Sequence, residues 1–181
     1  MKKIVLLVAF LFLLVGCSEL EMDSPTKKVE TFLNKYQTHD SEIINEFDVT
    51  MFEEENLTEE QKERYKEIML NQYKDLIYKI KEEKIDGNKA EVEVEIEVYD
   101  YNTALSNSYT YMDENKDEFF VDDVLDAVKF INYKLDQLFN YKERITYNIT
   151  FYLTRNDSKS EWELEELKET DLQKIHGIYS N

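Results

Sequence analysis

Side chains able to carry chemistry are scarce in this sequence, which contains one cysteine, two histidines and three glycines. Zinc sites of the usual Cys/His kinds and glycine-rich phosphate-binding loops are therefore excluded by count. His39 lies in a break between two predicted helices and His176 in the last turn of another, and neither has an activated nucleophile beside it. We expect both histidines at the surface, with His176 as a cation favoured by the helix dipole. We expect neither catalysis nor a bound cofactor.

One acidic segment has part of the spacing of a calcium-binding loop. Asp113, Asn115 and Asp117 would occupy the first, third and fifth positions of an EF-hand. The sixth position is Glu118, where the loop needs glycine, and the twelfth is Val124, where it needs a bidentate glutamate. We therefore interpret the segment as a solvated acidic stretch and predict no metal site.

The position of the cysteine gives it a role. Two lysines precede an unbroken apolar run, residues 4–15, which is too short to span a membrane and is typical of a signal peptide. The run ends in Leu-Val-Gly16-Cys17, which resembles the bacterial lipobox. The resemblance implies cleavage by signal peptidase between Gly16 and Cys17 and a diacylglycerol on the Cys17 thiol. The alternative is an ordinary secretory signal with a chance cysteine.

The lipobox divides the chain into a signal peptide (1–16), a tether (17–24) and a single domain (25–181). The mature protein is then expected on the extracytoplasmic face of a cell membrane, held by lipid. Removal of residues 1–16 leaves 20 basic and 40 acidic side chains. Anionic headgroups and nucleic acid would repel such a chain. Membrane contact is therefore expected through lipid on Cys17, and nucleic acid is not expected as a partner.

Strict alternation of apolar and acidic residues predicts a central β-strand over residues 89–101. Its apolar positions are Ala90, Val92, Val94, Ile96 and Val98. Its acidic positions are Glu91, Glu93, Glu95 and Glu97. The four glutamates would form an acidic stripe on the wet face of a sheet, with Lys79 and Lys81 neutralising only its middle. The stripe could keep an open sheet face from self-associating, or it could meet a cationic envelope partner.

A hairpin should join this strand to a strand that begins near Tyr78. A three-residue loop over residues 86–88 would pair Val94 with Ile80 and set Glu93 opposite Lys81. Ile85 does not fit that register cleanly, and a bulge near the turn would explain why.

The remaining pattern predicts an α+β fold, with N-terminal helices on a curved antiparallel sheet of two hairpins. Helices are expected over 25–37, 41–47 and from Thr58 to about residue 77, the last opened by a capping box. Apolar residues from Val124 through Val128 to Leu138 step by three and four, which predicts a long helical insertion over about 104–140, with a bend near Asp117 to Asp122. A second hairpin should follow, over residues 145–153 and 162–164, and a last helix ended by Gly177.

Three stretches have a familiar form: residues 85–90 followed by alternating valines, the Trp162-Glu-Leu164 strand, and the ending from Asp171 to Tyr179. Together with the lipobox they resemble uncharacterised small bacterial lipoproteins with a nuclear transport factor 2-like (cystatin-like cone) domain. The resemblance implies helices wrapped by a curved sheet, and Trp162 as possible lining of the mouth of a cone pocket. It supplies no catalytic motif.

Two functions remain compatible with the sequence. The first is a lipid-anchored binding or accessory module of a bacterial envelope, without catalysis. The alternative is a cone pocket that binds a small molecule or performs a reaction. A deep pocket with converging polar groups would favour the second function.

Overall fold

The computed structural model describes residues 23–46, 57–155 and 161–180. In chain order its elements are α2 (Pro25–Gln37), α3 (Ser41–Glu46), α4 (Glu59–Lys74), β1 (Ile77–Asp86), β2 (Lys89–Tyr99), α5 (Tyr101–Glu114), α6 (Lys116–Phe119), β3 (Phe120–Val121), β4 (Val124–Leu125), α7 (Ala127–Asn140), β5 (Arg144–Arg155), β6 (Trp162–Leu164) and α8 (Glu169–His176). The predicted α+β class is confirmed.

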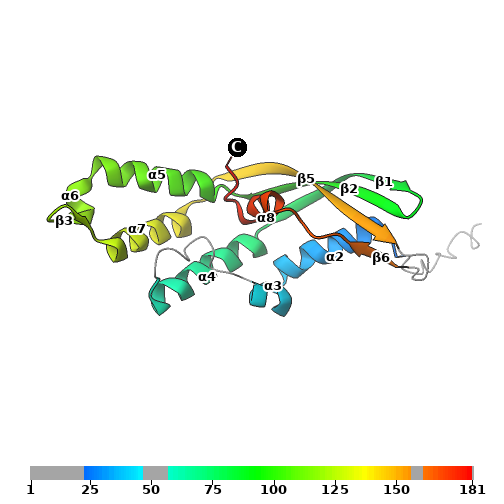
Figure 1. The fold of residues 1–181 in the computed structure, drawn as a ribbon, viewed down its shortest axis with the longest axis horizontal. Coiled ribbons are helices and arrows are strands. Elements are labelled where there is room, and N and C mark those ends of the chain that lie inside the picture. The colour runs from blue at the N-terminus through cyan, green and yellow to red at the C-terminus, as the bar shows by residue number, and fades with distance from the viewer. Residues whose placement is uncertain (1–22, 47–56, 156–160, 181) are drawn as a thin grey trace, which may run out of the picture.

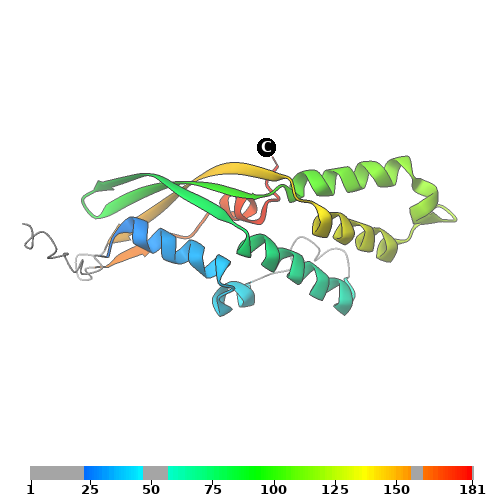
Figure 2. The same ribbon diagram turned by 180° about the vertical axis from the view of Figure 1, so that it is seen from behind.

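The predicted central strand, β2, is the centre of an antiparallel sheet with the order β1-β2-β5-β6. Its alternation determines which face is covered, since Val92, Val94, Ile96 and Val98 have no exposed surface. Helices α2 and α8 pack on that face, α4 packs in turn on α2, α7 and α8, and the other face is open (Figures 1 and 2). The space between sheet and helices is filled by buried side chains of both layers.

The first helices begin and end as their sequences predict. Ser24 caps α2 through a hydrogen bond from the Lys27 amide, and proline occupies the first turn. Thr58 and Gln61 form the complete capping box of α4. The part of the 41–47 prediction within the described residues is also confirmed, as α3.

The β1–β2 register confirms one part of the prediction and corrects another. Val94 lies opposite Ile80, as expected, but the turn has two residues, Gly87 and Asn88, with Gly87 at a φ of +62°. A bulge at Lys81 shifts the register between Ile80 and Glu82. Beyond that bulge Glu93 faces Glu82, not Lys81, and Ile85 faces Ala90. The bulge adds one residue to β1. A two-residue turn therefore gives the Val94–Ile80 pairing that was expected from a three-residue turn.

The segment between β2 and β5 differs most from its prediction. It is a helical hairpin, α5 and α7, which lie side by side and extend from one end of the sheet (Figure 1). The long helix expected from residue 120 onward begins only at Ala127, because β3 and β4 form a tight turn before it. Val124 and Val128, expected on a buried face, are 69% and 53% exposed.

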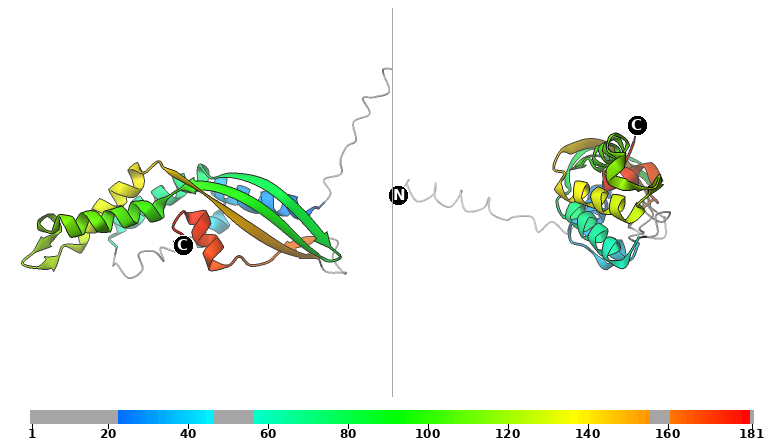
Figure 3. Two further views of the ribbon diagram at one scale, coloured as in Figure 1. Left: turned by 90° about the horizontal axis from the view of Figure 1, so that it is seen from above. Right: turned by 90° about the vertical axis from the view of Figure 1, so that its left-hand side faces the viewer.

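The molecule is long and narrow, with different structures at its two ends (Figure 3). One end carries the β1–β2 turn, β6 and the start of α2; the other carries α6 and the β3–β4 turn. The carboxylate of Asp23 accepts a hydrogen bond of 2.6 Å from the backbone amide of Trp162 in β6. The described chain therefore begins at the sheet end, opposite the helical hairpin.

Candidate functional site

The predicted acidic stripe lies on the open face of the sheet. Lysine and arginine side chains lie beside more of it than the sequence predicted. Glu95 forms an ion pair of 3.0 Å with Lys81, and Glu97 lies 3.6 Å from Arg144. Lys84 pairs with Glu82 at 2.9 Å. The hydrogen bond that Lys84 donates to the Glu82 carboxylate, followed by the charges of Glu82 and other nearby carboxylates, raises the Lys84 pKa above its ordinary value.

Cations thus lie along the whole stripe and not only at its middle. The bulge accounts for one end, because it brings Glu82 and Lys84 onto the open face opposite Glu93 and Glu91, and Arg144 of β5 accounts for the other. Glu82 and Glu93 are like charges directly opposite each other, an arrangement that destabilises a sheet locally. Beside them is a shallow hollow of about 150 Å³, lined by Glu82, Lys84, Glu91, Glu93 and Thr150. Within the described ranges, no group of three or more metal-ligating side chains is positioned to hold an ion.

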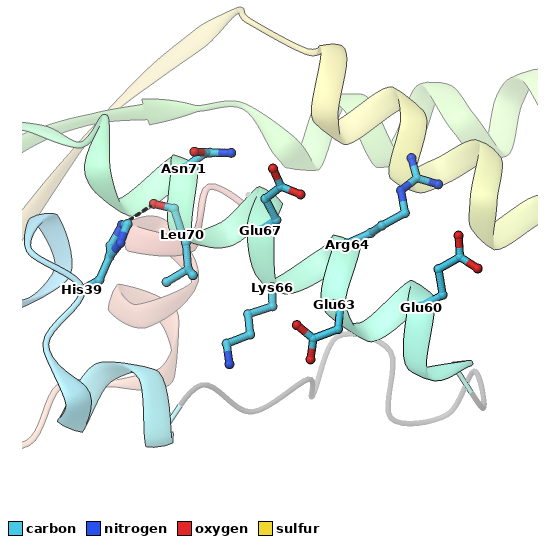
Figure 4. Close-up of a pocket in the computed structure, with 8 residues that line it drawn as sticks. All are labelled: His39, Glu60, Glu63, Arg64, Lys66, Glu67, Leu70 and Asn71. Carbon is cyan, nitrogen blue, oxygen red and sulfur yellow. Dashed lines mark hydrogen bonds between the residues drawn. The ribbon is translucent and has the colours of Figure 1, made fainter.

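A larger groove, of about 510 Å³, runs along α4 (Figure 4). Its lining residues are His39, Glu60, Glu63, Arg64, Lys66, Glu67, Leu70 and Asn71. The His39 Nε2 atom lies 2.7 Å from the carbonyl oxygen of Leu70, which only accepts, so this nitrogen carries the proton. Arg64 reaches away from the groove to Asp136 on α7, at 2.6 Å. The lining contains no hydroxyl or thiol nucleophile, and its charged groups point in different directions.

His176 is not the surface cation that its position predicts. Its ring packs on Tyr73 with 5.6 Å between centroids, and its Nδ1 lies 2.9 Å from the Tyr73 hydroxyl. Burial lowers the pKa of His176 from 6.5 to about 4, so the ring is neutral near pH 7. Burial also raises the pKa of Tyr73 above its ordinary range, so its hydroxyl stays protonated in this hydrogen bond. The pair holds α8 on α4. Neither residue lines the α4 groove or the hollow on the sheet.

Trp162, a candidate for lining a pocket, is 3% exposed and belongs to the core. The Arg155 guanidinium covers its ring at 4.7 Å from the centroid. Trp162 lines neither the α4 groove nor the hollow on the sheet. Little of its side chain is left for contact with a ligand.

The calcium-like spacing falls within helical structure. Asp113 lies near the end of α5 and Asp117 in α6, with Asn115 joining the two helices. The Asn115 side-chain amide donates to the Tyr111 carbonyl at 2.8 Å, so this residue ends a helix. The segment does not form the loop that an EF-hand requires.

The anchor residues Gly16 and Cys17 lie outside the described residues, and their roles stay predictions. No helix in the described part of the chain has both the length and the apolar character needed to cross a membrane.

Sequence reasoning missed one surface, at the end of the helical hairpin. Val121, Val124, Leu125 and Val128 are all exposed there. In the structure Asp122 and Asp123 form a turn there, although the apolar spacing of three and four continues through it.

The chain matches no protein-family model, and no similar protein was found among curated proteins or among solved structures. The geometry and the sequence therefore carry the functional argument on their own.

Proposed function

We propose that this protein is a lipid-anchored extracytoplasmic module of a bacterial envelope, which binds a partner and does not catalyse a reaction. The anchor is the diacylglycerol predicted on Cys17. The described polar groups favour binding over catalysis, because the charges around the α4 groove diverge and its lining offers no nucleophile. The alternative of a small-molecule-binding or enzymatic pocket has no specific observation in its favour.

The main support for the proposal is the position of Asp23 at the sheet end, a short distance along the chain from Cys17. Asp23 is fixed to the sheet end by its bond with the Trp162 amide and by an ion pair of 3.3 Å with Lys28. It lies six positions after Cys17, and a fully extended chain of that length spans roughly 20 Å. A lipid on Cys17 would keep the sheet end close to the bilayer, with the helical hairpin at the far end of the molecule (Figure 3).

We further propose a relationship to the nuclear transport factor 2-like cone domains. Helices precede the sheet in the chain, every strand pairing in the described sheet is antiparallel, and the covered face of the sheet packs on α2 and α8. The α5–α7 hairpin would then be the insertion between the two strand pairs. The fold class supports this relationship at the level of architecture alone.

The anchor is tested by metabolic labelling of producing cells with a fatty-acid analogue. Wild type should carry the label and fractionate with membranes, whereas Cys17→Ala should carry none and be released. Equal labelling of the two forms would refute the lipid anchor.

The orientation is tested with the lipidated protein in phosphatidylcholine vesicles that contain a headgroup acceptor dye. A donor dye would be attached to Asn88→Cys at the sheet end or to Asp123→Cys at the hairpin end; lipid blocks the Cys17 thiol. Asn88 belongs to the anchored end, because its carbonyl accepts from the Arg155 amide at 2.8 Å and Arg155 pairs with Trp162. Energy transfer should be strong from position 88 and weak from position 123. The reverse order would contradict the proposed orientation.

A further inference from the structure

Exposed apolar side chains gather at the end of the helical hairpin. Nine large apolar residues are exposed in the described chain, and four of them lie within eight positions, residues 121–128. Their exposed fractions are 67% for Val121, 69% for Val124, 37% for Leu125 and 53% for Val128. We name residues 119–129 the distal tip. Scattered exposed apolar residues are normal on a protein surface, but a cluster of this kind indicates an interaction site.

The fold holds these side chains outward on a rigid base. Phe119, only 2% exposed, packs its ring against Phe130 and Tyr133, with centroid distances of 5.4 and 5.3 Å. The Asp126 amide donates to the Phe119 carbonyl at 2.7 Å, and the Asp126 carboxylate caps α7. The valines are therefore exposed on a supported turn, which presents them without an ordering cost on binding.

The turn itself is in an unfavourable backbone conformation. Asp122 and Asp123 join β3 to β4 with φ values of +51° and +63°. Two successive left-handed residues make a type I′ turn, for which Asn-Gly is the preferred sequence. Aspartate is among the residues that tolerate such a turn, and the two of them place carboxylates at its tip.

Carboxylates flank the apolar cluster along the chain. The stretch from residue 113 to residue 129 contains seven acidic residues and two lysines. One of the lysines, Lys129, is occupied within the tip, since its Nζ lies 5.8 Å from the Phe119 ring centroid and donates to the Glu118 carbonyl. The tip therefore presents an apolar centre in a strongly negative field.

This combination selects among possible occupants. A second copy of the tip would bring the same carboxylates together, and like charges across an interface are costly. An anionic bilayer would be repelled for the same reason. A cationic surface with apolar side chains at its centre matches both properties of the tip.

We propose that the distal tip is a docking surface for a polypeptide segment that presents apolar side chains bordered by lysine or arginine. The valines and Leu125 would make the apolar contact, and Asp122 and Asp123 would meet the bordering cations. Its position away from the bilayer rests on the proposed lipid anchor; the docking surface itself does not.

The test uses the unlipidated chain of residues 18–181, so its outcome does not depend on lipid at Cys17. Every buried side chain of the described core lies between Val29 and Ile175, so this chain retains the whole core. The probe is a synthetic amphipathic helical peptide of roughly 15 residues, with leucine on one face and arginine on the other. One matched peptide replaces leucine by serine, and another replaces arginine by glutamate. Binding is mapped by backbone amide chemical shifts.

Shifts should be confined to the distal tip and arise only with the Leu/Arg peptide. The double variant Val121→Ser/Val124→Ser should raise the Kd about tenfold, since both side chains are exposed and their loss leaves the fold intact. The variant Asp122→Asn/Asp123→Gly keeps the turn in its preferred sequence and should weaken binding about fivefold at low salt. Its control, Glu165→Gln/Glu166→Gln, makes the same charge change at exposed residues of another loop and should bind as wild type.

Four results would overturn the proposal. If the peptide with serine in place of leucine bound equally well, the interaction would depend on charge alone. Shifts centred on the open sheet face would move the site elsewhere. Unchanged affinity of the valine variant would remove the apolar contact. Binding of phosphatidylcholine vesicles in preference to any peptide would make the tip a membrane contact.

Discussion

Gly177, at the end of α8, lies so close to the Tyr99 carbonyl oxygen at the end of β2 that a Cβ atom would overlap it. The same Cβ atom would overlap Nε2 of Gln72. Gly177 also has a φ of +73°, and its carbonyl accepts from the Asn102 amide at 2.9 Å. This single residue therefore brings the last helix, the central strand and the start of the helical hairpin together.

Replacement of Gly177 by alanine should lower the free energy of unfolding by about 3 kcal/mol or more, from backbone strain and steric overlap together. The matched control is Gly87→Ala, because Gly87 has a similar φ of +62° but nothing lies within 4 Å of the place that a Cβ atom would take there. The free energy of unfolding of that variant should fall only by the backbone strain, about 1–2 kcal/mol. Urea unfolding of both variants measures the difference, and equal losses would show that the contact with Tyr99 is unimportant.

The side-chain amide of Gln72 should be a major contributor to stability. It is fully buried; its oxygen accepts from the Tyr99 amide at 2.9 Å, and its nitrogen donates to the carbonyls of Tyr99 and His176 at 3.2 and 3.1 Å. Gln72→Leu keeps the volume but leaves buried backbone groups unpaired, which should cost about 2–4 kcal/mol. The exposed neighbour variant Asn71→Leu should change stability by less than about 0.5 kcal/mol in the same denaturation experiment. A mild effect at position 72 would mean that water satisfies these groups.

His176 should make stability fall on acidification. Its pKa is lowered from 6.5 to about 4 in the folded chain, so between these values only the unfolded chain binds the proton. Stability from this group is constant above pH 6.5 and decreases as pH falls toward 4, by at most about 1 kcal/mol per pH unit. His176→Gln lacks this dependence and retains an acceptor for the Tyr73 hydroxyl.

The measurement for His176 is the difference between wild type and His176→Gln in unfolding free energy, followed from pH 7 to pH 4. Carboxylate titrations are common to both proteins and cancel in this difference. The wild-type advantage should shrink steadily across that range. A difference that stays constant with pH would place His176 in an exposed, freely titrating environment.

Periodicity predicted the sheet well because each face of β2 has a uniform character. Val94 and Ile96 are buried and face Ile80 and Tyr78, as the alternation indicated. A period of two cannot report a residue that is inserted into one strand, so the bulge at Lys81 and the resulting Glu82–Glu93 pair were missed.

The helical hairpin was mispredicted for a related reason. Val124 and Val128 continue the three-and-four spacing of α7 toward its N-terminus, so the pattern extended the helix across the β3–β4 turn. Asp-Asp is not the preferred Asn-Gly sequence for such a turn, so the pattern indicated only a bend near Asp117 to Asp122 within a continuous helix. His176 was misplaced because its burial depends on Tyr73, about a hundred residues earlier in the chain, which local spacing cannot reveal.

The distal tip should unfold separately from the rest of the molecule. Phe119 and Phe130 are buried, and with the partly exposed rings of Tyr111 and Tyr133 they form an aromatic group outside the main core cluster. Phe119→Ala should remove several ring contacts and a buried surface, at a local cost of about 3 kcal/mol. Because few contacts connect this group to the sheet, the loss should appear as local opening.

Native-state hydrogen exchange resolves the two levels of stability. In Phe119→Ala, amide exchange should accelerate in residues 111–133, while the amides of β2 and β5 keep their protection. The control is Phe151→Ala in β5, where a fully buried ring packs against Phe32 in the main core. That variant should lower protection throughout the described chain by about 3–5 kcal/mol. If Phe119→Ala lowered protection in β2 as much as at the tip, the hairpin and the sheet would form one cooperative unit, and the tip would not be an independently stabilised structure.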